Sequence, residues 1–132
     1  MPPVNQKPNI LNRMDVNTDI AIKILTGFIK DQISKAGLKG AVLGLSGGID
    51  SALSAYLSAA ALGPENVLAV RMPYKSSSEE SLIHAEAVID DLGLPSMTVP
   101  ITGMADSLIE QFPDMAKLRK GNIMARCRMI VL

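Results

Sequence analysis

The residues best suited to chemistry stand together in the stretch SGGIDS, residues 46–51. Its serines carry hydroxyl groups that can donate hydrogen bonds to phosphate oxygens. Gly47 and Gly48 allow backbone angles that a side chain would forbid, and they let a ligand approach the main chain closely. An apolar run precedes this stretch and a helix-forming run follows it, so it joins a strand to a helix start, where free amides favour an anion. We therefore predict a phosphate-binding loop at residues 46–51.

Asp50 separates this loop from two other phosphate-binding patterns. The Walker pattern requires Gly-Lys-Ser/Thr, and no lysine follows Gly48. The glycines also do not fall at the spacing G-x-G-x-x-G of the dinucleotide fingerprint. A carboxylate beside phosphates is unfavourable unless a cation bridges them, so Asp50 predicts a bound Mg²⁺. The alternative is a tight turn that Asp50 or Ser51 caps, with no ligand.

The elements that must position this loop follow a strand–helix–strand period. Apolar runs predict strands that start near residues 41, 67 and 97, about 26 and 30 residues apart, which leaves room for one helix each time. Such units form a parallel sheet with right-handed crossovers, and ligands bind at the carboxyl ends of its strands. Arg71 ends the second strand and is therefore expected at the same crevice as the 46–51 loop. The fold class is α/β, an open parallel sheet with helices on both faces, Rossmann-like. The predicted strands are 41–45, 66–70 and 97–101, and the helices between them are 50–62 and 79–92.

Helices are also predicted outside this core. Residues 15–36 place apolar side chains at helical spacing. Short and long helices are expected at 104–112 and from Asp114 onward, and the last one places Arg119, Asn122 and Arg126 on one face. Three prolines predict an irregular arm at residues 1–13. Residues 14–132 are expected to belong to a single domain.

Composition limits the class of protein. With 48% hydrophobic and 20% charged residues the chain reads as globular. Lysine plus arginine and aspartate plus glutamate number 13 each, which argues against bulk binding to nucleic acid. No apolar run is long enough to span a membrane and no secretory signal is visible. The single cysteine, Cys127, fits a reducing compartment, so a cytoplasmic protein is expected.

Three segments carry a resemblance to a known family. SGGIDS resembles the pyrophosphatase loop of ATP-dependent adenylating enzymes, a group that includes NAD, GMP and asparagine synthetases. Residues 70–81 (VRMPYKSSSEES) and 120–129 (KGNIMARCRM) are similar to segments of NAD synthetases, and the second is the more specific match. GMP synthetases share the loop without this helix signature.

The resemblance implies an ammonia-dependent NAD synthetase, which adenylates deamido-NAD with ATP and then lets ammonia displace AMP. It implies ATP and Mg²⁺ as cofactors, a homodimer, and no protein nucleophile. Asp50 would hold the metal, and Asn122 and Arg126 would contact deamido-NAD. The residues that would bind ATP are Ser46, Gly47, Gly48, Ile49, Asp50, Ser51 and Arg71.

The last four residues, 129–132, are all apolar, from which we expect an N-terminal fragment that is inactive by itself. Two alternatives remain open. One is a GMP synthetase-like or other adenylating ligase of the same group. The other is a non-catalytic nucleotide-binding or dimerisation module, in which the helix at 114–132 would be the contact element.

Overall fold

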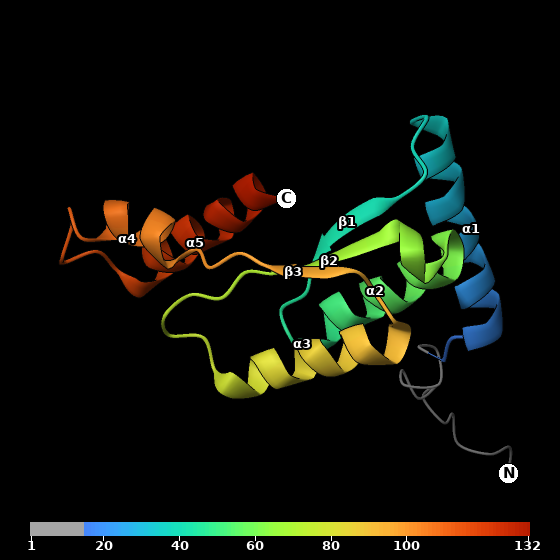
Figure 1. Cartoon of the computed structure of the whole chain (residues 1–132), viewed down its shortest axis with the longest axis horizontal. Coiled ribbons are helices and arrows are strands. Elements are labelled where there is room, and N and C mark those ends of the chain that lie inside the picture. The colour runs from blue at the N-terminus through green and yellow to red at the C-terminus, as the bar shows by residue number, and fades with distance from the viewer. Residues whose placement is uncertain (1–14) are drawn as a thin grey trace, which may run out of the picture.

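A computed structural model describes residues 15–132, and the predicted arm at 1–13 lies outside this range. In the described part, three strands form one parallel sheet in the order β1-β2-β3 (Figure 1). The strands are β1 (Ala41–Gly44), β2 (Val67–Arg71) and β3 (Ser96–Thr98). Ala41 pairs with Val67 and Arg71 pairs with Thr98. This register brings all three strands to the same carboxyl edge.

Two crossover helices connect the strands, as predicted. They are α2 (Ile49–Leu62), which a short 3₁₀ turn η2 (Pro64–Asn66) follows, and α3 (Glu79–Leu92). The Ser78 side chain caps α3 by accepting a hydrogen bond from the Ser81 amide. Gly93 ends α3 in the left-handed region, with φ of 64°, where glycine carries no steric cost. The α/β class with an open parallel sheet is therefore confirmed.

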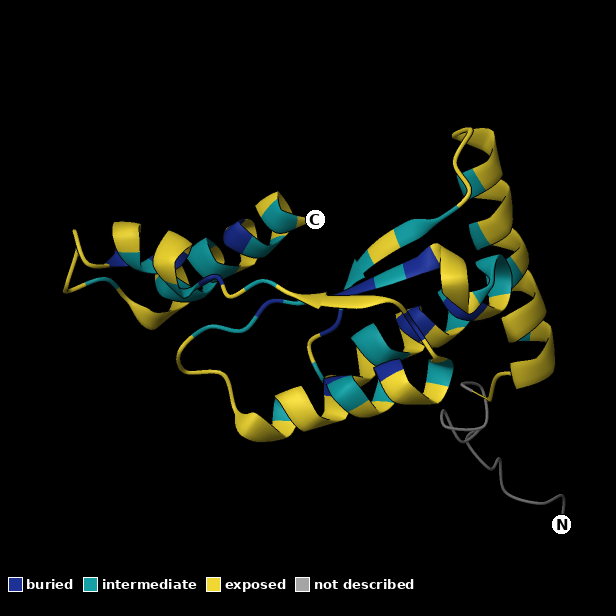
Figure 2. Cartoon of the chain, in the orientation of Figure 1, coloured by how far each residue is buried: buried dark blue, intermediate teal, exposed yellow. Residues whose placement is uncertain are grey.

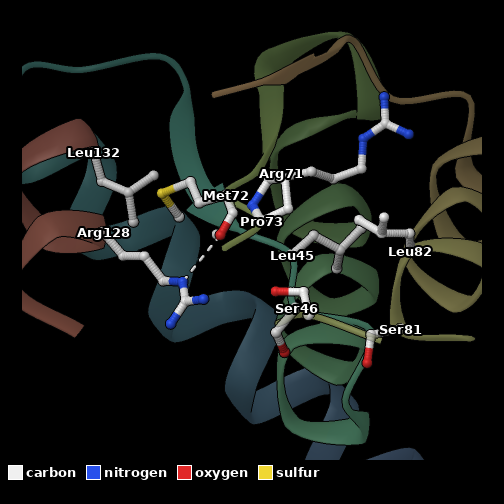
Figure 3. Close-up of a pocket in the computed structure, with 11 residues that line it drawn as sticks. Leu45, Ser46, Arg71, Met72, Pro73, Ser81, Leu82, Arg128 and Leu132 are labelled. Carbon is white, nitrogen blue, oxygen red and sulfur yellow. Dashed lines mark hydrogen bonds between the residues drawn. The ribbon is translucent and has the colours of Figure 1, made fainter. Parts of the chain in front are cut away.

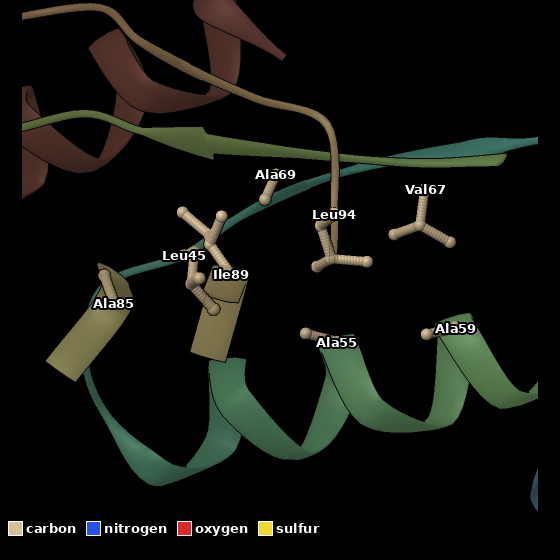
Figure 4. Packing of buried hydrophobic residues seen from close by; sticks show 8 residues of the cluster. All are labelled: Leu45, Ala55, Ala59, Val67, Ala69, Ala85, Ile89 and Leu94. Atoms are coloured by element: carbon tan, nitrogen blue, oxygen red, sulfur yellow. The ribbon is translucent and has the colours of Figure 1, made fainter. Parts of the chain in front are cut away.

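The core lies on both sides of β2 because its side chains alternate between the two faces. Val67 and Ala69 point to α2 and α3 on one face (Figure 4), whereas Val70 belongs to the cluster on the other face. Figure 2 shows buried positions, in dark blue, along β2. The first cluster contains Leu45, Ala55, Ala59, Val67, Ala69, Ala85, Ile89 and Leu94. The second contains Val70, Met72, Ile101, Ala105, Ile109 and Cys127. Burial of a side chain as large as Ile101, which is 0% exposed, contributes roughly 1.5–3 kcal/mol.

The first helix, α1 (Thr18–Lys35), packs along α2 and contributes no fully buried residue. Asn17 caps it by accepting a hydrogen bond from the Ile20 amide at 3.1 Å. The helical spacing of its apolar side chains predicts this helix correctly. Most of these large side chains are nevertheless exposed; Ile24 is 64% exposed and Phe28 is 61% exposed.

The last two helices lie beyond the carboxyl ends of the strands (Figure 1). They are α4 (Thr102–Ile109) and α5 (Lys117–Val131). The prediction that the last helix starts at Asp114 was wrong. The Met115 amide donates to the Phe112 carbonyl in a turn at 3.0 Å, and Ala116 is the extended N-cap residue. Within residues 15–132, no helix has the length and apolar character needed to cross a bilayer.

Candidate functional site

The 46–51 loop leaves the carboxyl end of β1 and runs directly into α2. Hydrogen bonds of its two serines, Ser46 and Ser51, hold the loop together. The Ser51 hydroxyl accepts from the Ser46 amide at 3.2 Å and donates to the Gly48 carbonyl at 3.0 Å. The two hydroxyl oxygens lie 3.0 Å apart, and the Ser46 hydroxyl accepts from the Gly48 amide at 3.2 Å. The loop is thus held in one shape by its own side chains.

Gly47 fixes how this loop meets the start of α3. Its φ of +84° lies in the left-handed region, and a β-carbon there would lie 2.2 Å from the Ser81 carbonyl oxygen. Only glycine satisfies both conditions. Gly47 therefore brings the main chain of the loop against the first turn of α3.

The start of α2 leaves main-chain donors free. Gly48 is its N-cap residue and supplies no side-chain cap. Within the described residues the first intrahelical donor is the Ala52 amide, which bonds to the Gly48 carbonyl, so the amides of residues 49–51 find no protein acceptor. A helix start with free amides attracts an anion.

Asp50 lies in the first turn of α2 and is exposed. Its carboxylate forms no hydrogen bond or ion pair with any residue in the range 15–132. No cluster of three potential ligands among histidine, cysteine, aspartate and glutamate occurs in that range. One free carboxylate fits Mg²⁺, because this ion usually binds through one or two carboxylates together with substrate phosphates and water. It does not fit a metal held by protein ligands alone.

A cavity of about 490 Å³ opens beside the loop (Figure 3). Hydroxyl groups line it from three places: Ser46 from the loop, Ser77 from the segment before α3, and Ser81 from the first turn of α3. The full lining is Gly44, Leu45, Ser46, Arg71, Met72, Pro73, Ser77, Ser81, Leu82, Arg128 and Leu132. Among the predicted ATP-binding residues, Ser46 and Arg71 line this cavity, whereas Gly47, Gly48, Ile49, Asp50 and Ser51 belong to the loop and helix start beside it.

Arg71 lines the cavity, but its guanidinium group is directed elsewhere. The side chain extends away from Ser46 and forms an ion pair with Glu86 of α3 (Figure 3). The Arg71 Nε atom is buried and has no hydrogen-bond partner among the described residues. Arg71 therefore keeps one unused donor while its charge is balanced by Glu86.

The two predicted deamido-NAD residues, Asn122 and Arg126, are both exposed on α5 and do not line this cavity. The structure instead places Arg128 there, a residue that the sequence analysis did not select. Its Nε atom donates a hydrogen bond to the Met72 carbonyl oxygen at 3.1 Å. The signal that could have found it is helical geometry: on a helix, positions two apart differ by roughly 200°, so Arg126 and Arg128 face opposite ways.

A polar clamp holds the segment that follows β2. The Tyr74 hydroxyl and the Lys75 ammonium both donate to the Asp106 carboxylate of α4, each at 2.7 Å. The hydrogen bond from Lys75, followed by the one from Tyr74, lowers the pKa of Asp106 below its usual value. The same contact with Asp106 raises the pKa of Tyr74 and of Lys75. Because the Ser77 hydroxyl accepts from the Tyr74 amide at 2.9 Å, the clamp also positions a residue of the cavity wall.

An open parallel sheet with a preformed glycine loop, a free helix start and a hydroxyl-lined cavity defines an α/β protein whose strand-end loop presents free donors, the arrangement that favours an anion. The model of the NAD synthase family matches residues 21–132. The chain therefore belongs to the NAD synthase family.

Individual relatives agree with this membership. The NH(3)-dependent NAD(+) synthetase of Trichlorobacter lovleyi is 52% identical over 122 residues, which are 92% of this chain and 45% of that protein. The enzyme of the same name from Fusobacterium nucleatum is 50% identical over 122 residues, or 92% of this chain and 47% of that protein. The chain thus spans less than half the length of these relatives.

Solved structures show the same likeness. The NH3-dependent NAD synthetase from Campylobacter jejuni, in complex with the nitrate ion, superposes with a TM-score of 0.82 at 36% identity, covering 89% of this chain and 51% of that one. The glutamine-dependent NAD+ synthetase from Acinetobacter baumannii, in complex with ADP, gives a TM-score of 0.76 at 32% identity. It covers 81% of this chain and 21% of that one.

Proposed function

We propose that this chain supplies the ATP-binding part of an ammonia-dependent NAD synthetase. The reaction would couple ATP to the amidation of deamido-NAD through an adenylated intermediate, and it would release AMP and pyrophosphate. One observation carries the proposal: in a chain of the NAD synthase family, the SGGIDS stretch forms a closed loop with free helix-start amides beside a cavity.

The chemistry of adenylation suits this arrangement. The departing pyrophosphate gains negative charge as the bond to the α-phosphate breaks. Donors that are already in place stabilise such charge without reorganisation. The donors that are free here are the amides of residues 49–51 at the start of α2. The hydroxyls of Ser46 and Ser51 would donate to phosphate only after leaving their hydrogen bonds within the loop. A magnesium ion held by Asp50 would neutralise part of the phosphate charge when it is bound.

The residue roles in the proposal follow the predicted assignments. Arg71 would contact the nucleotide after its guanidinium leaves Glu86, and its unpaired Nε atom supports that role. Asn122 and Arg126 would contact deamido-NAD from the exposed side of α5, outside the cavity. The ATP-binding set is Ser46, Gly47, Gly48, Ile49, Asp50, Ser51 and Arg71.

The names of the relatives support two details. Ammonia as the nitrogen source rests on relatives that are called NH(3)-dependent. An adenine nucleotide as the ligand is supported by the Acinetobacter baumannii relative, whose structure holds ADP. The homodimer is also part of the proposal. Exposed apolar side chains on α5, such as Met129 at 65% and Ile130 at 70%, support it. A cytoplasmic location is supported by the single, buried thiol of Cys127.

Isothermal titration calorimetry tests the proposal. We expect the chain to bind Mg-ATP with higher affinity than Mg-GTP, and to lose this binding in Ser51→Ala. The matched control is Ser54→Ala, which removes a hydroxyl that bonds only to the Asp50 carbonyl of its own helix. A chain that binds xanthosine monophosphate instead of deamido-NAD would move the assignment to a GMP synthetase-like ligase. No binding of Mg-ATP at all would contradict the proposal.

A second candidate, a nucleotide-binding or dimerisation module without catalysis, is favoured by the share of the relatives' length that the chain spans. An assay with ATP, deamido-NAD and ammonium tests whether the chain alone is catalytic. We expect the chain alone to bind Mg-ATP and to form no NAD. Sedimentation velocity measures its oligomeric state in the same preparation. NAD formation by the chain alone would exclude the second candidate.

A further inference from the structure

We propose that Arg128 is a phosphate-binding residue of the cavity and contacts the polyphosphate chain of the bound nucleotide. The inference rests on the proposed function, which it deepens by adding a ligand contact from α5. It also adds a second positive charge at the site, beside that of Arg71, whose guanidinium is paired with Glu86 in this structure.

The position of Arg128 follows from one contact. Its Nε atom donates to the Met72 carbonyl oxygen at 3.1 Å, directly after the carboxyl end of β2. A guanidinium group has five N–H donors in a fixed plane, so one anchored edge orients the others. Figure 3 shows Arg128 across the cavity from Ser46, with its free nitrogen atoms directed away from the Met72 carbonyl. The side chain is half-buried, and its remaining donors are available to a ligand.

The charge balance of the cavity supports an anionic ligand. Among the side chains that line it, only those of Arg71 and Arg128 carry a charge. Arg71 is paired with Glu86, whereas Arg128 has no acidic partner in the range 15–132. Burying an unbalanced guanidinium is unfavourable, and a bound anion would relieve that cost.

The other lining groups favour phosphate over a single carboxylate. Three hydroxyls line the same cavity, those of Ser46, Ser77 and Ser81. A phosphate group offers several acceptor oxygens, which can bind the Arg128 guanidinium and the serine hydroxyls at the same time. Arginine binds phosphate in a bidentate manner. The apolar part of the lining limits competition from water and consists of Leu45, Met72, Pro73, Leu82 and Leu132.

The test measures Mg-ATP affinity by calorimetry in the whole chain, at low and at high salt. For Arg128→Gln we expect the dissociation constant to rise about ten- to hundredfold, because a hydrogen-bonded charge contact is lost. We also expect the salt dependence of binding to become weaker, since one charge no longer contributes. Arg128→Lys keeps the charge without the fork and should recover only part of the affinity. Arg119→Gln is the matched control: it removes an exposed charge from the same helix and should leave affinity unchanged.

Each outcome separates the possibilities. Unchanged Mg-ATP affinity in Arg128→Gln overturns the inference. Weaker binding with an unchanged salt dependence also overturns it, because it assigns Arg128 a purely structural role through Met72. If Arg128→Gln does not fold, Arg128→Lys takes its place, and parent-like Mg-ATP affinity in that variant overturns the fork contact. Failure of the parent chain to bind Mg-ATP instead removes the proposed function, so the two failures are distinct.

Discussion

The main chain at Gly47 lies so close to Ser81 that a β-carbon at Gly47 would be 2.2 Å from the Ser81 carbonyl oxygen. This contact joins two helix starts, because Gly47 precedes α2 and Ser81 lies in the first turn of α3. The 46–51 loop is therefore held in two ways: its main chain at Gly47 contacts the first turn of α3, and hydrogen bonds of its own serines close it.

Gly47→Ala tests this contact. The positive φ and the contact with a backbone oxygen together are expected to lower the free energy of unfolding by about 2 kcal/mol or more. Gly48→Ala is the control, because its φ is −84° and its nearest atom would be the Ser46 hydroxyl at 3.4 Å. We expect it to cost less than about 1 kcal/mol. Urea denaturation measures both, and equal losses would contradict the role given to Ser81.

The Ser51 hydroxyl is expected to stabilise the loop. Ser51→Ala leaves the Ser46 amide without its acceptor, so the free energy of unfolding should fall by about 1 kcal/mol. Ser54→Ala removes a hydroxyl that bonds only within α2 and should change stability by less than about 0.5 kcal/mol. Thermal and urea unfolding compare the two variants. A larger loss in Ser54→Ala would show that the loop hydroxyls do not hold its shape.

The clamp on Asp106 should make stability depend on pH. Its folded-state pKa is lowered, chiefly by Lys75, from an ordinary value of 3.8. The contribution to stability is therefore present above pH 3.8 and is lost as pH falls through the lower, folded-state pKa. We expect Asp106→Asn to melt below the parent at pH 7, and this difference to shrink towards pH 3. Glu110→Gln, on an exposed residue next to α4, is the control and should show no such trend. A difference independent of pH would contradict the ionic part of the clamp.

Arg71 and Glu86 should be coupled energetically, because their ion pair is partly shielded. The Arg71 side chain is 22% exposed. A double-mutant cycle with Arg71→Gln and Glu86→Gln is expected to give a coupling free energy of about 1 kcal/mol. The control cycle uses the pair of Lys35 and Asp31, whose side chains are 68% and 52% exposed, and should give about 0.3–0.5 kcal/mol. Equal coupling in both cycles would mean that Arg71 is not held by Glu86.

The sequence allowed the sheet and its crossovers to be predicted because their signals are local. Apolar runs mark β1 and β2, and Gly93 marks the end of α3. Boundaries were less accurate where pairing continues without regular structure. The predicted third strand, 97–101, ends at Thr98, but the Val99 and Ile101 amides still donate to the carbonyls of Arg71 and Pro73.

The site was predictable only in part, for a physical reason. Spacing along the chain places the 46–51 loop at a strand end, but it does not tell which side of α5 turns toward the sheet. That choice depends on the packing of Cys127 into the second cluster and on the hydrogen bond from Arg128 to Met72. The ion pair between Arg71 and Glu86 could likewise not be predicted from the sequence, because Glu86 comes close to Arg71 only when α3 packs along the sheet.

Cys127 gives the molecule a built-in reporter of α5. It is the single cysteine, it is 7% exposed, and it lies one residue before Arg128, whose hydrogen bond to Met72 joins α5 to the segment directly after β2. An alkylating reagent can reach the sulfur of Cys127 only when α5 moves away from the second cluster. The rate of thiol modification therefore reports how often α5 opens. A bound nucleotide that contacts Arg128 should lower this rate, and the measurement needs no label on the protein.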